Sequence, residues 1–156
     1  MRVLTFAHGY APVEAGGGER AALSLHRWLV DEPGIDPVLV ARAPRALVGH
    51  EASFAAFRGN PREIVASVPG EDRFSFESDN LPLLERMVDE LLDRFAPELV
   101  HIQHFLGWSL DLVTLLARRG VPVVLTLHEM LLICHHEGKM VKTWGCLLYT
   151  SDAADE

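Results

Sequence analysis

Two stretches in the second half of the chain decide the fold, Ala96-Pro-Glu-Leu-Val-His-Ile-Gln-His104 and Val121-Pro-Val-Val-Leu-Thr-Leu-His-Glu129. Each contains a short apolar run, at 98–103 and at 121–127, that is typical of a buried strand. Between them, apolar residues at helical spacing predict a helix within 107–120. A strand, a helix and a second strand in this order form the repeating unit of a parallel α/β sheet. We expect the second strand to be central in its sheet because it is strongly apolar.

The first half of the chain shows the same alternation. Short apolar runs predict strands at 3–7 and 37–41, and the segment 19–30 between them has the spacing of an amphipathic helix. This helix is expected to have one apolar face, which is formed by Ala21, Ala22, Leu25, Trp28 and Leu29.

The middle of the chain is less regular. Residues 43–79 are interrupted by proline and glycine, and only 73–76 is expected to form a brief strand there. Asn80, or alternatively Asp79, is a good cap for a helix predicted at 80–95, and Pro97 follows its end. The fold class predicted is α/β, a Rossmann-like doubly wound parallel sheet.

Composition argues against several classes of protein. The 156 residues are 49% hydrophobic and carry a net charge of −8 without a cluster of Lys or Arg, which is unfavourable for a nucleic-acid partner. The two cysteines, Cys134 and Cys146, are too few for a disulfide framework. The sequence shows no secretory signal and no apolar stretch of the roughly 20 residues that a membrane span needs. We expect a cytoplasmic location, with at most a peripheral association with the inner face of the membrane.

In such a sheet, ligands are expected at the loops that follow Ala7, Gln103 and Leu127. The first loop leads to Gly16-Gly-Gly-Glu19, where glycines let the backbone approach a ligand and a helix start favours anions such as phosphate. The G-x-G-x-x-G fingerprint of dinucleotide binding and the Gly-Lys-Ser/Thr of a Walker loop are both absent from this stretch. A plain turn without a ligand is the alternative interpretation.

Several histidines lie near the same loops. His8 and His128 each follow directly on a predicted strand, which is the usual place for ligand contact in this fold. For His101 and His104, a structural and a functional role are equally supported. His26 is expected to be a packed or solvent-facing residue without a functional role.

We expect no metal site in this chain. His128-Glu129 begins like a zincin motif, but Leu132 occupies the position of its second histidine. The metal-capable residues at 134–137 are adjacent, and adjacent residues rarely share one tetrahedral site.

Taken together, these segments resemble glycosyltransferase family 4. The first strand, the loop to Gly-Gly-x-Glu and the following helix resemble the opening of that family. More specifically, Pro97 to His104 resembles its P-D-x-V-H-x-H segment, and Pro122 to Glu129 resembles P-x-V-x-T-x-H-D. Glu129 replaces the common Asp of the second segment. In the C-P pair that follows, Cys134 is present but His135 stands where Pro is usual. The resemblance covers roughly residues 1 to 145.

The resemblance implies the amino-terminal half of a GT-B enzyme, in which two Rossmann-like domains face each other across a cleft. This half would mostly hold a glycan or lipid-linked acceptor, and a carboxy-terminal domain of the same chain would hold a nucleotide-sugar donor. By similarity, Gly17 and Gly18 would lie near the donor diphosphate, and His128 would be the catalytic residue beside the transferred sugar. The anomeric configuration would be retained, usually without a metal or another cofactor. The expected substrate-binding set is completed by Gly16, Glu19, His8, His104 and Glu129.

Two segments of the chain are distinguished on this basis. Residues 1–145 are predicted to be an incomplete acceptor-side domain, and residues 146–156 a non-native tail without a strand or helix period. The tail resembles the translated read-through of a transposase sequencing adapter. The basic pair and paired glutamates of a donor domain are absent from this sequence, so we expect no transferase activity from the chain alone.

Two other functions stay open. A non-catalytic doubly wound binding domain would require a genuine stop after Glu156 and a stable, compact product. Another GT-B enzyme, such as a sugar-nucleotide epimerase, would share the fold. The sequence names neither the donor sugar nor the acceptor, and cell-surface polysaccharide assembly is suggested only by the family as a whole.

Overall fold

The computed structural model describes residues 1–13, 16–48, 53–68, 76–128, 141–144 and 147–150. The chain divides into two compact units, Met1–Thr126 and Leu127–Glu156. In the second unit, β7 (Val141–Trp144) pairs antiparallel with β8 (Leu147–Thr150). The sequence indicated no strand in the tail, and for the part occupied by β8 that expectation was wrong.

The first unit is built on a six-stranded sheet with the order β3-β4-β2-β1-β5-β6. β1 (Arg2–Ala7) lies between β2 (Asp36–Arg42) and β5 (Leu99–Gln103) and is parallel to both. β6 (Val123–Thr126) is parallel to β5. The strands predicted from apolar runs are therefore confirmed, and their parallel pairing is confirmed with them.

β6 does not occupy the central position that its apolar sequence suggested. It ends the strand order of the sheet, and the side chain of Val124 is 48% exposed. An apolar run indicates that a strand is buried on average, but it does not determine which strands lie beside it. The sheet is instead centred on β1, which supplies Leu4 and Phe6 to the core.

The opposite edge of the sheet is a hairpin that the sequence did not predict. β4 (Asn60–Ala66) is parallel to β2, whereas β3 (Phe54–Phe57) is antiparallel to β4, so the sheet is mixed and not wholly parallel. The hairpin turns at Arg58 and Gly59, whose φ angles of 48° and 79° suit a tight β-turn. Of the brief strand expected at 73–76, only Phe76 is described, and it lies outside any strand.

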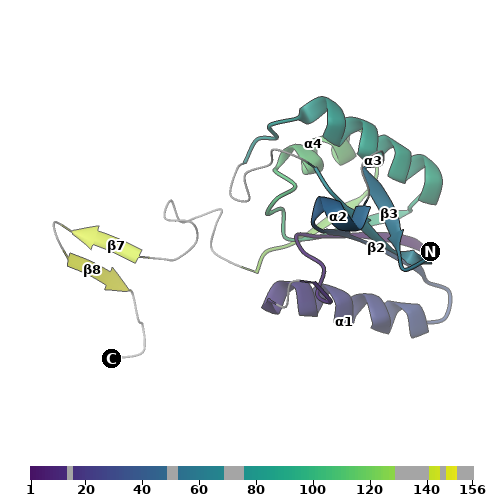
Figure 1. Ribbon diagram of the computed structural model, residues 1–156, viewed down its shortest axis with the longest axis horizontal. Coiled ribbons are helices and arrows are strands. Elements are labelled where there is room, and N and C mark those ends of the chain that lie inside the picture. The colour runs from purple at the N-terminus through teal and green to yellow at the C-terminus, as the bar shows by residue number, and fades with distance from the viewer. Residues whose placement is uncertain (14–15, 49–52, 69–75, 129–140, 145–146, 151–156) are drawn as a thin grey trace. The chain divides into compact units, whose positions relative to one another are not determined.

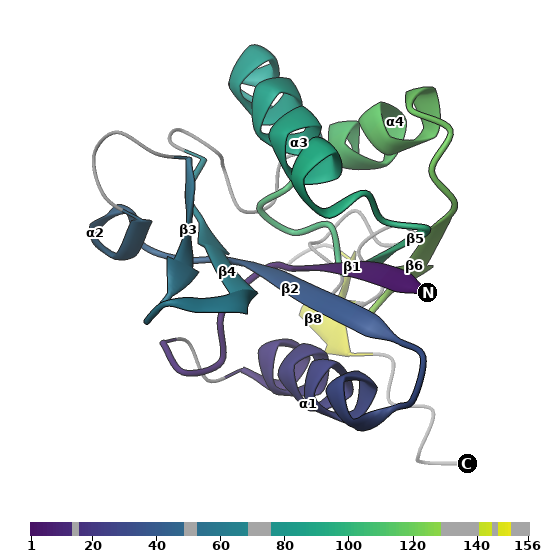
Figure 2. The same ribbon diagram turned by 90° about the vertical axis from the view of Figure 1, so that its right-hand side faces the viewer.

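Helices cover both faces of the sheet, as a doubly wound fold requires (Figures 1 and 2). α1 (Gly17–Asp31) lies on one face, together with the short α2 (Arg45–Val48). α3 (Leu81–Phe95) and α4 (Asp111–Arg118) lie on the other and enclose the larger apolar core with Leu4, Phe6 and neighbouring strand residues. No helix in the described part of the chain is both long and apolar enough to cross a membrane.

The predicted apolar face of α1 is correct in part: Ala22 is buried and Leu25 and Leu29 are half-buried, but Ala21 and Trp28 are exposed. The residues that turn toward the sheet are Glu19, Ala22, Leu23 and His26, whereas Trp28 is 59% exposed. These four residues have the i, i+3, i+4, i+7 spacing of one helix face, but two of them are polar. A prediction from hydrophobicity alone therefore selected the helix face next to the one that is buried. His26 is packed, as expected, and its burial lowers the pKa of its imidazole.

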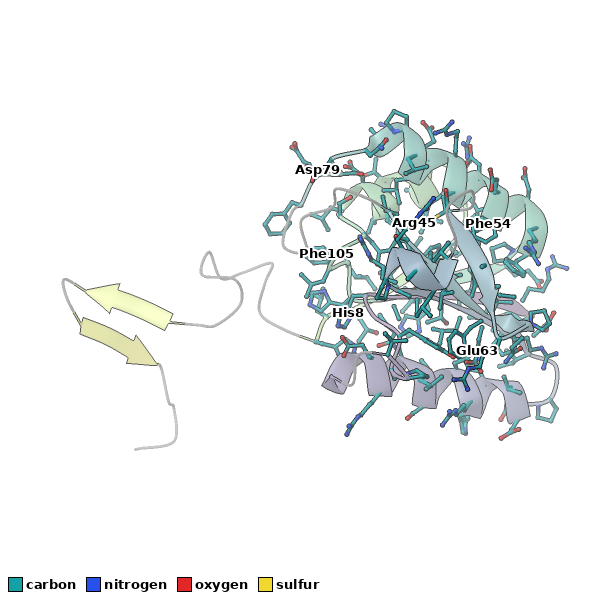
Figure 3. All side chains as sticks on the ribbon, viewed as in Figure 1. His8, Arg45, Phe54, Glu63, Asp79 and Phe105 are labelled. Atoms are coloured by element: carbon teal, nitrogen blue, oxygen red, sulfur yellow. The ribbon has the colours of Figure 1, made fainter. Side chains whose placement is uncertain are left out.

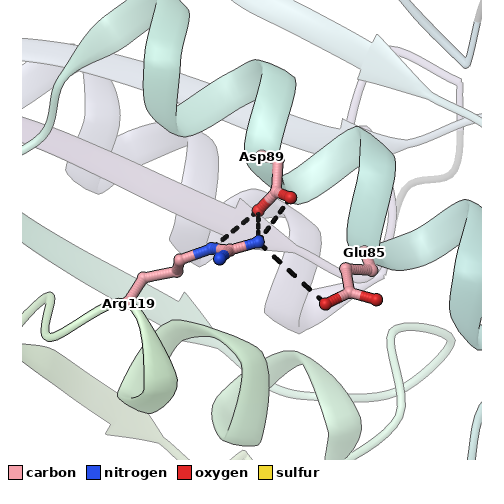
Figure 4. Close-up of polar contacts among 3 residues, drawn as sticks. All are labelled: Glu85, Asp89 and Arg119. Atoms are coloured by element: carbon pink, nitrogen blue, oxygen red, sulfur yellow. Dashed lines mark hydrogen bonds and ion pairs between the residues drawn. The ribbon is translucent and has the colours of Figure 1, made fainter.

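The start of α3, in the second helical layer, agrees with the prediction from the sequence. The Asn80 side chain accepts a hydrogen bond from the Leu83 amide at 3.3 Å and so caps α3, as predicted. Beyond α4, the Arg119 guanidinium forms an ion pair with Asp89 of α3 and lies 4.0 Å from Glu85 (Figure 4). This exposed bridge joins α3 to the end of α4, although such pairs contribute little to stability.

Trp108 fixes the loop after β5 against β1. It lies in the turn before α4, which begins at Asp111 and not at Gly107. The buried indole donates from Nε1 to the Ala7 carbonyl at 2.9 Å, and its ring packs edge-to-face on Phe6 at a centroid distance of 5.2 Å. One side chain thereby holds the ends of two neighbouring strands together.

Replacement of Trp108 or of Trp28 by phenylalanine distinguishes a buried tryptophan from an exposed one. Trp108→Phe removes the donor for a buried carbonyl and leaves a void, and we expect a loss of about 2–4 kcal/mol in the free energy of unfolding. Trp28→Phe changes an exposed side chain and should stay within about 0.5 kcal/mol of the parent. Urea unfolding followed by circular dichroism measures both, and equal losses would contradict this assignment of the α1 face.

Candidate functional site

The candidate site is built where neighbouring parallel strands end. Ala7 of β1 is in register with Gln103 of β5, which is in register with Thr126 of β6. Because parallel strands end at the same edge, the residues directly after Ala7 and Gln103 are brought together. These residues are His8 and His104. Their imidazole rings meet edge-to-face at a centroid distance of 5.5 Å.

A buried pair joins the end of β1 to the start of α1. The Nε2 atom of His8 lies 3.0 Å from a carboxylate oxygen of Glu19, and the two side chains are only 8% and 4% exposed. An ionised carboxylate can only accept, so the His8 Nε2–H donates this bond. The other ring nitrogen, Nδ1, faces the carbonyl oxygen of Gln103 at 3.4 Å. His8 therefore links the glycine-rich loop to both central strands of the site (Figure 3).

The glycines of the loop differ in what surrounds them. A Cβ atom added to Gly18 would lie 2.7 Å from Cε1 of His8, and one added to Gly16 would lie 2.2 Å from a carboxylate oxygen of Glu19. Both glycines are thus required by the packing of the buried pair. A Cβ atom on Gly17 would meet no described residue within 4 Å. Gly17 is therefore the glycine that leaves backbone accessible to a ligand.

His104 is held in an unusual conformation beside His8. Its φ angle is 77°, in the left-handed region, and the residue is 1% exposed. Its Nδ1 accepts a hydrogen bond from the Leu106 amide at 3.2 Å, while its own amide donates to the Thr126 carbonyl at 3.0 Å. These contacts turn the chain sharply at the end of β5 and bring the imidazole to the edge of the sheet.

A polar cluster continues from this turn along the sheet. His101 of β5 contacts the Thr126 hydroxyl of β6 at 2.8 Å and the Gln103 amide nitrogen at 3.3 Å. The three side chains lie on one face, since His101 and Gln103 are two residues apart on a strand. His101 thus has a structural role in pairing β5 with β6, and the sequence alone left that role undecided.

Arg42 is a residue of this edge that the sequence analysis missed. At the end of β2, its guanidinium lies 5.9 Å from the Trp108 ring centroid and donates to the Val68 carbonyl at 3.0 Å. A Cβ atom on Gly107 would lie 3.0 Å from Cδ of Arg42, and Gly107 has a φ of 68°. An isolated arginine at a strand end carries no spacing pattern, so nothing in the sequence could have revealed this contact.

The remaining predicted residues lie elsewhere along the chain. His128 follows β6 by two residues, is exposed and belongs to the second unit. Glu129, Cys134 and the neighbouring metal-capable residues lie outside the described residues. Over the described ranges, no group of three or more His, Cys, Asp or Glu side chains is arranged to hold a metal ion.

Comparison with known proteins identifies the family of this chain. Residues 15–151 match the model of the family described as Glycosyltransferase Family 4, and the match extends into the predicted tail at 146–151. No curated protein matches the chain. The chain is similar, at 14% identity and a TM-score of 0.46, to the crystal structure of UDP-GlcNAc 2-epimerase from Neisseria meningitidis bound to UDP-GlcNAc. That alignment covers 80% of this chain but 32% of the epimerase, so the chain spans about a third of its length. The family match covers most of the sequence, and the chain belongs to glycosyltransferase family 4.

Proposed function

We propose that this chain is the acceptor-side half of a retaining glycosyltransferase that moves a sugar from a nucleotide-sugar donor to a glycan or lipid-linked acceptor. Membership of the family supports the reaction class. In this proposal a second Rossmann-like domain of the same polypeptide supplies the donor-binding face. The chain by itself is then inactive, because half of the cleft is open to water and the donor diphosphate lacks its cationic clamp.

The observation that carries the proposal is the open backbone at Gly17. α1 begins there, and its N-cap residue Gly16 provides no side-chain hydrogen bond to the first turn. The amides at the start of a helix lack partners within the helix, and together with the helix dipole they favour an anion. Because no residue in the described ranges lies within 4 Å of the missing Cβ atom of Gly17, a diphosphate can approach these amides closely.

The buried pair beside this loop has a part in the same proposal. The carboxylate of Glu19 would repel a diphosphate at the helix start if it were exposed to it. The imidazole of His8 donates a hydrogen bond to it at 3.0 Å, which holds the carboxylate in its buried position and fixes the position of the loop. His8 and Glu19 then act as positioning residues for the leaving group, and the sugar is positioned by His128.

Alanine substitutions at two adjacent glycines test the role of the loop. Gly18→Ala must displace the His8 ring and should lower the free energy of unfolding by roughly 1–3 kcal/mol. Gly17→Ala has room and should leave stability within about 0.5 kcal/mol, but its methyl group would obstruct the diphosphate. In the enzyme that carries both halves, we expect Gly17→Ala to raise the KM for the nucleotide sugar by about tenfold or more, equivalent to roughly 1.4 kcal/mol.

The stability of both glycine variants is measured by thermal unfolding, and their kinetic constants are measured by steady-state kinetics with varied donor concentration. Because Gly17→Ala retains the fold, its kinetic effect cannot be attributed to unfolding. An unchanged KM for the donor in Gly17→Ala would remove the loop from the donor site and leave it as a plain turn.

His128→Ala tests the catalytic assignment. If His128 bonds a hydroxyl of the transferred sugar in the transition state, its loss should lower kcat by roughly 10²-fold. The residue is exposed, so the unfolding midpoint should change little. The adjacent Leu127, which is 44% exposed, provides the control Leu127→Ala.

Product analysis in the same assay identifies the reaction. Transfer to an acceptor with release of the nucleoside diphosphate is expected from the two-domain enzyme, and no transfer from the present chain alone. A kcat of His128→Ala close to that of the parent enzyme would contradict the catalytic role of this histidine. An epimerised nucleotide sugar without transfer would replace the transferase assignment.

A further inference from the structure

A pocket of about 620 Å³ lies on the α1 side of the first unit, apart from the candidate site. Its walls come from the loop after β1, from α1 and from the β3–β4 hairpin. The residues on which the argument depends are Tyr10, Arg27, Phe57, Arg58, Asn60 and Glu63. Figure 3 shows Glu63 over the middle of α1, whereas His8 lies near the beginning of that helix. Glu63 is also two strands away from β1, which is about 10 Å across a sheet.

The floor of the pocket is aromatic and carries a fixed carboxylate. The rings of Tyr10 and Phe57 pack edge-to-face at a centroid distance of 4.7 Å. The Tyr10 hydroxyl donates to one oxygen of Glu63, and the Asn60 amide donates to the other at 3.1 Å. Burial and this carboxylate raise the pKa of the Tyr10 hydroxyl, so it remains a donor. The Glu63 carboxylate is thereby held in one orientation, with lone pairs left to accept further hydrogen bonds.

Two arginines stand at the rim of this floor. The Arg58 guanidinium lies over the Phe57 ring at 5.2 Å, and Arg27 projects from the exposed side of α1. Both side chains line the pocket together with Tyr10. Over the described ranges of the chain, neither guanidinium has a carboxylate within 4.0 Å.

The turn that presents Arg58 is itself unusual. Arg58 has a φ of 48°, in a region that asparagine or glycine occupies far more readily than a long side chain does. The neighbouring Arg62 differs, because its guanidinium is paired with Asp36 at 3.2 Å. Arg58 is therefore a cation in a strained backbone position, directed over an aromatic ring, and no carboxylate of the described residues lies within 4.0 Å of its guanidinium.

We propose that this pocket binds a saccharide unit that carries one anionic group, either a carboxylate or a phosphate. Among the described lining residues, two guanidiniums and one carboxylate give one excess positive charge, which a single anionic group neutralises. The sugar ring packs on Tyr10 and Phe57, the anionic group meets Arg27 and Arg58, and the hydroxyls bond to Glu63 and Asn60. This inference rests on the proposed function in one respect: the bound saccharide is taken to be a unit of the acceptor, distant from the acceptor end that receives the transferred sugar.

Titration of this chain with small saccharides tests the proposal directly. Glucuronate and glucose 6-phosphate are the two probes, and isothermal titration calorimetry measures binding. We expect at least one of them to bind at least tenfold more tightly than glucose. Tighter binding of glucuronate identifies a carboxylate ligand, and tighter binding of glucose 6-phosphate identifies a phosphate ligand. Glucose binding as tightly as both, or no binding of either charged saccharide, would overturn the proposal.

Matched variants locate the binding on the molecule. Combined Arg27→Gln and Arg58→Gln should weaken the preferred probe at least tenfold, whereas Arg62→Gln, on the same hairpin, should leave it unchanged. If Arg62→Gln weakened binding of the probe as much as the double variant does, the effect would be one of general charge, and this result would contradict a specific pocket. Inorganic phosphate that bound as tightly as glucose 6-phosphate would remove the sugar from the proposal. No transfer reaction is involved, so failure here leaves the proposed function intact, and absence of transfer activity would leave this binding result standing.

Discussion

The contact between His8 and Glu19 is the constraint on which the candidate site at this edge of the sheet depends. A carboxylate that is 4% exposed is costly to bury unless a donor faces it, and the His8 ring supplies that donor at 3.0 Å. The His8–Glu19 pair in turn restricts which residues can lie next to it. Gly16 and Gly18 have no room for a Cβ atom, and α1 must turn Glu19 toward the sheet. Through Nδ1 of His8 the same contact reaches the Gln103 carbonyl at the end of β5.

Continuous apolar runs predicted most strands of the first unit, because strands covered on both faces have few positions for polar residues. The same signal failed in part on α1, where the buried stripe includes Glu19 and His26, and hydrophobicity selected a face with an exposed Trp28. It also failed on β3 and β4, since neither the turn at Arg58-Gly59 nor the short Phe54–Phe57 strand has a strong local pattern. The position of a strand within a sheet depends on which strands pair with it, and a local sequence pattern does not contain this information. The edge position of β6 could therefore not be predicted from its apolar residues.

The candidate site was predictable in part for a related reason. Loops after parallel strands are where this fold holds ligands, and that rule located His8, His104 and the glycine loop before any contact was known. The rule could not distinguish the three glycines. A Cβ atom on Gly16 or Gly18 would clash with a neighbouring side chain, whereas Gly17 has open backbone as far as the described residues extend. The pocket between α1 and the hairpin had no sequence signal, because its aromatic and charged residues come from separate elements.

A structure of the two-domain enzyme with an intact nucleotide sugar or a non-hydrolysable analogue tests the central claim most directly. The claim is that the start of α1 receives the donor diphosphate while the His8–Glu19 pair stays buried behind it. The account predicts phosphate oxygens within hydrogen-bonding distance of the amides at Gly17 and Gly18, with His8 still bonded to Glu19. A diphosphate bound away from this helix start, with Gly17 facing only solvent, would contradict it.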